Sequence, residues 1–148
     1  MLHDEISTDP LGLGYATWLP DSPGTVAELL NAKSFVLAQE MVLREIDVIG
    51  QHPDGPEAGD AVLAKLEAFG ATSQPLARIV ARALRALSAE GLNVGSESVR
   101  SMLTTLGQAG ALTVDEADKL MSMADQPASR AQVLGLGVVT VEQVIGAI

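Results

Sequence analysis

The sequence of 148 residues contains no cysteine, which excludes disulfides, thiol nucleophiles and thiolate metal sites. It has only two histidines, His3 and His52, and these lie far apart in the sequence. Two separated imidazoles offer little on which to build a zinc site or a histidine-activated nucleophile. We therefore expect no metal site, no cofactor and no catalytic activity.

Aromatic residues make up 3% of the chain, although hydrophobic residues make up 47%. The core must therefore consist of Leu, Val, Ile, Ala and Met, which is typical of packed helices. No segment approaches the roughly 20 continuous apolar residues of a membrane span. These features predict a soluble helical protein, long enough to bury a core without metal or disulfide support.

Basic residues are scarce, with nine Lys and Arg against 19 Asp and Glu and a net charge of −10. Such a chain repels DNA on average, so nucleic-acid binding would need a local basic patch. The segment from Ser129 superficially resembles a helix-turn-helix, but its second helix, from Thr140, carries no Lys or Arg. A recognition helix needs side chains for phosphates and base edges. We expect binding to neither nucleic acid nor membrane.

We expect residues 1–24 to form an irregular N-terminal arm, because Pro10, Pro20 and Pro23 interrupt any helix and Gly12 and Gly14 lie where turns are expected. Tyr15 and Trp18, the only Tyr and Trp of the chain, lie in this arm together with Leu11. Large aromatic side chains in such a segment must bury themselves against their own domain or against a neighbour. Both alternatives remain open, and the second makes Leu11, Tyr15 and Trp18 candidate partner-binding residues.

Residues 25–148 predict a helical domain, so we expect an all-α fold with about six to seven short helices in a bundle. Helix starts are indicated by capping residues, which are Thr25 with Glu28, Ser96, Thr113 with Glu116, Ser129 and Thr140. A second helix is expected over residues 38–49, and a third is expected to stop at Gly70 in a left-handed conformation.

The fourth predicted helix follows Pro75 and has one continuous apolar stripe, formed by Leu76, Ile79, Val80, Ala83, Leu84 and Leu87. Arg78, Arg82 and Arg85 occupy the opposite face. One interpretation is a solvated outer face. The other is an inter-subunit contact in which these guanidinium groups meet carboxylates of a neighbour, and it makes the three arginines candidate partner-binding residues.

Two segments resemble a known kind of protein. Residues 5–16, which contain Asp-Pro-Leu-Gly-x-Gly-Tyr, and residues 129–140, Ser-Arg-Ala-x-x-Leu-Gly-Leu-Gly-x-Val-Thr, are similar to the ends of small uncharacterised proteins encoded among bacteriophage structural genes. Residues 26–31 fit the same opening, and residues 40–47 match weakly. Residues 52–110 depart from the pattern.

The resemblance implies a structural virion protein of a tailed bacteriophage, in the neck, tail tip or tail-fibre attachment region. Such a protein would be made in the host cytoplasm, reside in the virion, and bind other phage structural proteins in a homo- or hetero-oligomer. The resemblance implies no enzymatic activity. The alternatives are a non-virion helical adaptor, such as a tail-assembly chaperone, and a DNA-binding regulator.

Overall fold

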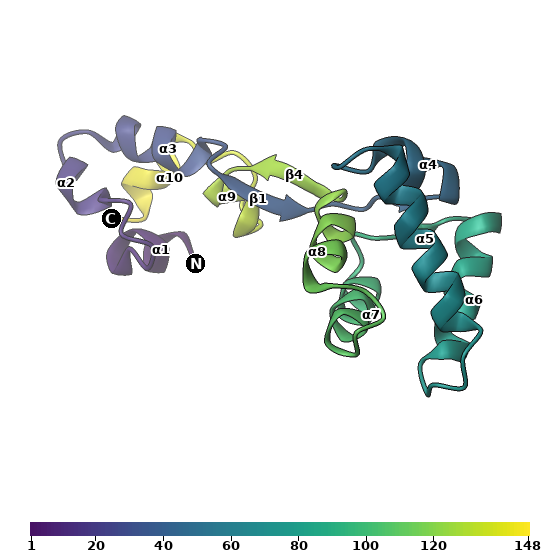
Figure 1. Ribbon diagram of the computed structural model, residues 1–148. Coiled ribbons are helices and arrows are strands. Elements are labelled where there is room, and N and C mark those ends of the chain that lie inside the picture. Colours follow the sequence, from purple (N-terminus) through teal and green to yellow (C-terminus); the bar gives the residue numbers. More distant parts are fainter. The chain divides into compact units, whose positions relative to one another are not determined.

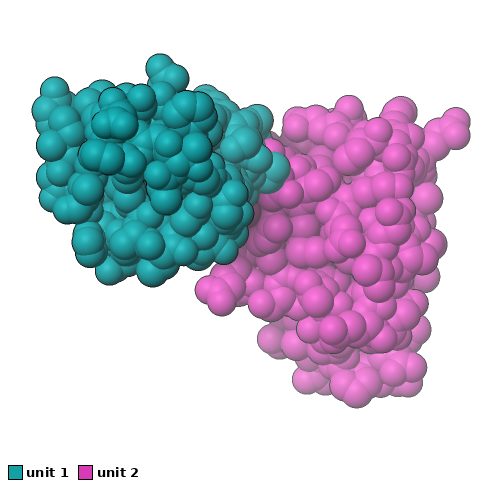
Figure 2. Space-filling view, turned by 90° about the vertical axis from the view of Figure 1, so that its left-hand side faces the viewer, with its two compact units in different colours: residues 1–37, 126–148 teal, residues 38–125 magenta.

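The computed structural model describes all 148 residues and contains ten helices and two two-stranded sheets (Figure 1). The chain divides into two compact units, which Figure 2 distinguishes by colour. Unit 1 consists of residues 1–37 and 126–148, and unit 2 consists of residues 38–125. Unit 2 is therefore inserted into the sequence of unit 1. The predicted division at residue 24 does not correspond to this boundary.

The prediction of a mostly helical protein is confirmed, but the fold is not purely α. Strand β1 (Phe35–Ala38) pairs with β4 (Asp125–Ala128). Strand β2 (Val42–Leu43) pairs antiparallel with β3 (Leu92–Asn93), with Val42 opposite Asn93 and Leu43 opposite Leu92. Both connections between the units run through β1 and β4, because the unit boundaries fall within these two strands.

Unit 1 contains three helices from the beginning of the chain and two from its end. They are α1 (Leu2–Thr8), α2 (Tyr15–Trp18), α3 (Pro23–Asn31), α9 (Arg130–Val133) and α10 (Val141–Gly146). Helix α3 packs against α9 and α10. The core consists of Ile6, Tyr15, Val26, Ala27, Leu30, Ala131, Val139 and Val144.

The prediction of an irregular arm over residues 1–24 is therefore wrong. Pro10 and Pro20 lie between helices, and Pro23 occupies the first turn of α3, where a missing N–H costs nothing. The segment is ordered through contacts with residues of α9 and α10 more than 100 positions later, which local patterns cannot reveal.

Unit 2 contains the five remaining helices, α4 (Glu45–Gln51), α5 (Pro56–Gly70), α6 (Ala77–Ala89), α7 (Glu97–Gln108) and α8 (Val114–Ser122). They pack in pairs, α4 with α5, α5 with α6, and α7 with α8. Their core is entirely aliphatic among its most buried members, which include Val62, Val80, Leu103 and Leu106. None of the ten helices combines the length and apolarity that a membrane span requires.

Four of the predicted helix starts are confirmed. The side chains of Ser96, Thr113, Ser129 and Thr140 each accept a hydrogen bond from a backbone N–H of their own helix. Three other local predictions are wrong: α3 begins at Pro23 with Ser22 as its cap, residues 38–43 contribute to two strands, and Gly70 ends α5 without a positive φ.

Candidate functional site

The two segments for which the sequence predicts a resemblance to bacteriophage structural proteins, residues 5–16 and 129–140, meet inside unit 1. The Arg130 guanidinium donates from Nε and Nη2 to the two carboxylate oxygens of Glu5, both at 2.7 Å. Asn31 Nδ2 donates to the carbonyl oxygen of Val139 at 2.7 Å, and the Val139 N–H donates to Asn31 Oδ1 at 2.9 Å. These bonds join the beginning of the chain to its end.

Tyr15 completes this polar cluster. Its side chain has no exposed surface, and its hydroxyl donates to Glu5 Oε1 at 3.3 Å. Burial, together with the adjacent Glu5 carboxylate, raises the pKa of the Tyr15 phenol. Since Glu5 itself is only 4% exposed, the cluster is closed to any substrate. Tyr15 thus packs on its own domain, the first of the two alternatives, and offers no surface to a partner.

The loop before Tyr15 explains the Asp-Pro-Leu-Gly-x-Gly-Tyr pattern. The Asp9 carboxylate accepts hydrogen bonds from the N–H groups of Leu13 and Gly14, both at 2.7 Å. Gly12 and Gly14 have φ values of 65° and 82°, which side chains with a Cβ rarely adopt. The pattern therefore encodes a turn that delivers Tyr15 to the core. These residues therefore contribute to the structure of unit 1.

The other two predicted contact residues of the N-terminal segment are accessible. Leu11 is 49% exposed and Trp18 is 44% exposed. Both are large apolar side chains on the surface of unit 1, so both are free to contact a partner.

Unit 1 also has a shallow open groove between α3 and the start of α10, which sequence reasoning missed. Glu28 and Glu142 line it together with Val141, which is 39% exposed. Both carboxylates are exposed, and neither belongs to an ion pair. Only the packing of α10 on α3 brings them into one groove, since 113 intervening residues separate them in the chain.

In unit 2, α6 presents the predicted arginine face. Arg78, Arg82 and Arg85 are all exposed, and none has a carboxylate within ion-pair distance. Three other basic residues of this unit are paired: Lys65 with Glu116 at 2.5 Å, Arg100 with Asp125 at 3.4 Å, and Lys119 with two aspartates. Ile79, predicted to point inward, is instead 51% exposed beside the arginines. It lies at the edge of the apolar stripe, where the core no longer covers it.

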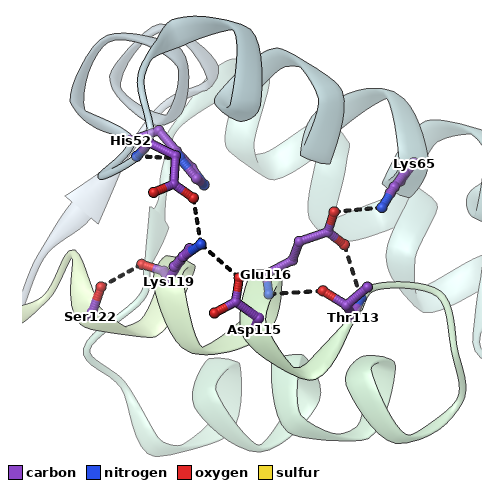
Figure 3. A network of polar contacts seen from close by, with 8 residues as sticks. His52, Lys65, Thr113, Asp115, Glu116, Lys119 and Ser122 are labelled. Carbon is purple, nitrogen blue, oxygen red and sulfur yellow. Dashed lines mark hydrogen bonds and ion pairs between the residues drawn. The ribbon is translucent and has the colours of Figure 1, made fainter.

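Figure 3 shows a polar network that ties α8 to the segments around α5. Lys119 Nζ contacts Asp54 at 2.5 Å and Asp115 at 2.6 Å. The hydrogen bond from Lys119 lowers the pKa of Asp54, and these two carboxylates raise the pKa of Lys119. The hydrogen bond from Lys65 likewise lowers the pKa of Glu116. These ion pairs cross-link α8 to α5 and to the segment that precedes α5.

His52 lies beside this network and is 6% exposed. Its Nδ1 accepts a hydrogen bond from the Asp54 N–H at 3.2 Å, whereas its buried Nε2 has no hydrogen-bond partner. No group of His, Asp or Glu side chains is arranged to hold a metal ion. His3 lies in the other unit, where Nδ1 is 2.7 Å from the carbonyl oxygen of Ala147.

The interior of unit 2 contains a cavity of about 50 Å³ between the α5–α6 and α7–α8 pairs. All fifteen lining side chains are apolar, among them Leu66, Ala83, Val99 and Leu106. A cavity without any polar group cannot orient a polar substrate, and it stays dry. It is a packing feature of the core and holds no reactive group.

Comparisons of the chain with protein-family models, with curated proteins and with solved structures find no match.

Proposed function

We propose that this chain is a structural virion protein of a tailed bacteriophage, located in the neck, tail tip or tail-fibre attachment region, and that it acts by contact with other phage structural proteins. The observation that carries the proposal is the role of the phage-like residues. Five of these residues make hydrogen bonds that stabilise unit 1: Glu5, Asp9, Tyr15, Asn31 and Arg130. Their pattern therefore marks a shared scaffold.

The surface of that scaffold supports a contact function. Leu11 and Trp18 expose about half of their side chains, and exposed large apolar residues that the fold does not need are typical of protein–protein contact sites. Trp is also among the residue types most enriched in binding hot spots. Leu11 and Trp18 are accordingly the proposed anchors of unit 1, with the arginines of α6 as the proposed contact face of unit 2.

The division of the chain also supports the proposal. Residues 52–110, which depart from the phage-like pattern, lie entirely within unit 2. On this proposal unit 1 is the module that this chain shares with such proteins, and unit 2, which begins with the weakly matching residues 40–47, holds the part that differs. A scaffold with an inserted unit suits a protein that contacts more than one neighbour.

The test is the protein content of purified particles of the phage that encodes the chain, measured by quantitative mass spectrometry. We expect the chain at a constant copy number per particle. The double variant Leu11→Ala/Trp18→Ala, supplied in place of the natural chain, should be incorporated at least about tenfold less, because loss of hot-spot residues costs about 2 kcal/mol or more.

The matched control is Val114→Ala, which removes an exposed apolar side chain of unit 2 (63% exposed) and should leave incorporation unchanged. Absence of the natural chain from particles, with capture of other tail proteins from infected cells, would favour the assembly-chaperone alternative. Retention on duplex DNA at moderate salt would favour the DNA-binding alternative.

A further inference from the structure

The two units carry complementary charged surfaces. Unit 1 has six acidic and two basic residues. One of those two basic residues, Arg130, already forms an ion pair with Glu5 inside the unit. Its groove between α3 and α10 is lined by Glu28 and Glu142, both without a counter-charge. The groove is therefore an anionic site for which unit 1 supplies no counter-charge.

Helix α6 has the opposite character. Arg78, Arg82 and Arg85 follow one another at intervals of four and three residues, so they lie on one face over about 10 Å of the helix axis. No carboxylate neutralises them, although unit 2 has 13 acidic residues. Ile79 exposes half of its side chain at the edge of this face.

We propose that α6 of one copy docks into the α3–α10 groove of a second copy of the chain. The arginines face Glu28 and Glu142, and Ile79 packs against the exposed Val141. Guanidinium groups bind carboxylates in a bidentate, directional way, and an amphipathic helix in a groove is a common recognition geometry. The inference rests on the proposed function, because it supplies the self-contact of an assembly subunit.

The charge and chemistry of the two surfaces favour a second copy over nucleic acid. A polyanion would approach a chain of net charge −10 and would find only three adjacent cations. An exposed Ile at the edge of the arginines matches an apolar residue on a protein better than it matches a phosphate backbone. The groove and the helix also differ from each other, so two copies can exchange two such contacts in a closed dimer, or the contact can repeat head-to-tail as in rings and filaments.

The experiment measures the mass of the intact chain by light scattering, at about 0.05 M and about 0.5 M salt. We expect a concentration-dependent mass of at least twice 15.3 kDa at low salt, and a decrease toward the monomer at high salt. The triple variant Arg78→Glu/Arg82→Glu/Arg85→Glu should be monomeric, and so should the double variant Glu28→Lys/Glu142→Lys. An equimolar mixture of the two variants should regain the oligomeric mass, because each then meets its complement.

The matched control is Glu67→Lys/Asp118→Lys, which changes the net charge as much as the groove variant does but alters two exposed residues of unit 2. It should keep the natural mass. Circular dichroism checks that each variant folds, and Arg78→Gln/Arg82→Gln/Arg85→Gln replaces the charge-reversed helix if that one does not.

A monomeric natural chain at low salt would overturn the inference, as would a mixture of variants that stays monomeric. Binding of labelled duplex DNA that is lost in the arginine variants, without self-association, would reassign the arginines to phosphates. A chain found in particles yet monomeric in solution would overturn this contact and leave the proposed function standing.

Discussion

In unit 1 the most buried charges form an ion pair inside the core, whereas in unit 2 the ion pairs lie at the surface around an aliphatic interior. Glu5 and Arg130 have exposed fractions of 4% and 14%, while the exposed fractions are 47% and 22% for Lys65 and Glu116, and 31% and 49% for Lys119 and Asp54. Burying a charge is costly unless its partner is present, so unit 1 depends on a few specific bonds. Unit 2 depends on summed apolar burial and tolerates the loss of any one ion pair.

One residue makes this comparison measurable. Trp18 is the only tryptophan and lies in unit 1. Its fluorescence therefore reports the unfolding of unit 1, whereas far-ultraviolet circular dichroism reports the helices of both units. Two substitutions and two changes of pH should affect the stability of the units differently, and we take them from the largest expected effect on stability to the smallest.

Arg130→Met should have the largest effect, because it leaves the Glu5 carboxylate buried without a counter-charge. We expect the free energy of unfolding of unit 1 to fall by about 3–5 kcal/mol. The urea midpoint of the Trp18 fluorescence transition should fall strongly, whereas the part of the circular dichroism transition that reports unit 2 should stay at the same urea concentration. Lys65→Met, which removes a surface pair, should cost about 1 kcal/mol or less. Equal losses of stability in the two variants would contradict the contrast between a buried ion pair in unit 1 and surface ion pairs in unit 2.

Leu106→Ala tests the contribution of apolar burial to the stability of unit 2. Leu106 is 1% exposed and lines the apolar cavity, so truncation removes buried methyl groups and enlarges a space already unfilled. We expect a loss of about 2–5 kcal/mol in the dichroism transition and an unchanged Trp18 transition. A shift of both transitions together would mean that the two units unfold as one.

Alkaline pH should weaken unit 1 through Tyr15. The pKa of its phenol is raised above the ordinary value of 10.0, chiefly by burial. A raised folded-state pKa means that stability is fully present below about pH 10 and is lost as the pH rises above it. The urea midpoint of the Trp18 signal should therefore fall as the pH rises above about 10. Tyr15→Phe removes the titrating group, so a decline of equal size in that variant would assign the effect elsewhere.

Acidic pH should have the smallest effect on stability, and that effect should fall on unit 2. The pKa values of Asp54 and Glu116 are lowered from 3.8 and 4.5 by Lys119 and Lys65. Their contribution is present above these ordinary values and is lost as the pH falls through and below them. The dichroism midpoint should decline slightly below about pH 4.5. Lys65→Met/Lys119→Met should flatten that decline, and an unchanged slope would show that other carboxylates cause it.

Local chemistry made several features predictable from the sequence. A helix N-cap depends only on a side-chain hydroxyl or carboxylate and the next three residues. The helix starts at Ser96, Thr113, Ser129 and Thr140 could therefore be predicted from local sequence. The exposed arginine face of α6 followed from helical spacing alone. The largely helical class followed from a composition poor in aromatics.

The features that were missed depend on distant partners. Residues 2–8 form a helix in a unit whose other half begins at residue 126, and no local pattern encodes the bond from Glu5 to Arg130. The groove with Glu28 and Glu142 has the same origin. Residues 38–43 have apolar residues at helical spacing, yet Ala38 ends β1, and Val42–Leu43 form β2 because Leu43 pairs with Leu92. Tertiary pairing there outweighs local propensity.

The connectivity of unit 1 also sets an order of events during synthesis on the ribosome. Residues 1–37 emerge first but lack the partners in residues 126–148, so they wait while the contiguous unit 2 is made and folds. A chain that stops anywhere before Arg130 has neither the buried ion pair nor the groove between α3 and α10. Only a chain that extends at least to Glu142 has that groove, so shorter products of translation cannot bind a partner through it.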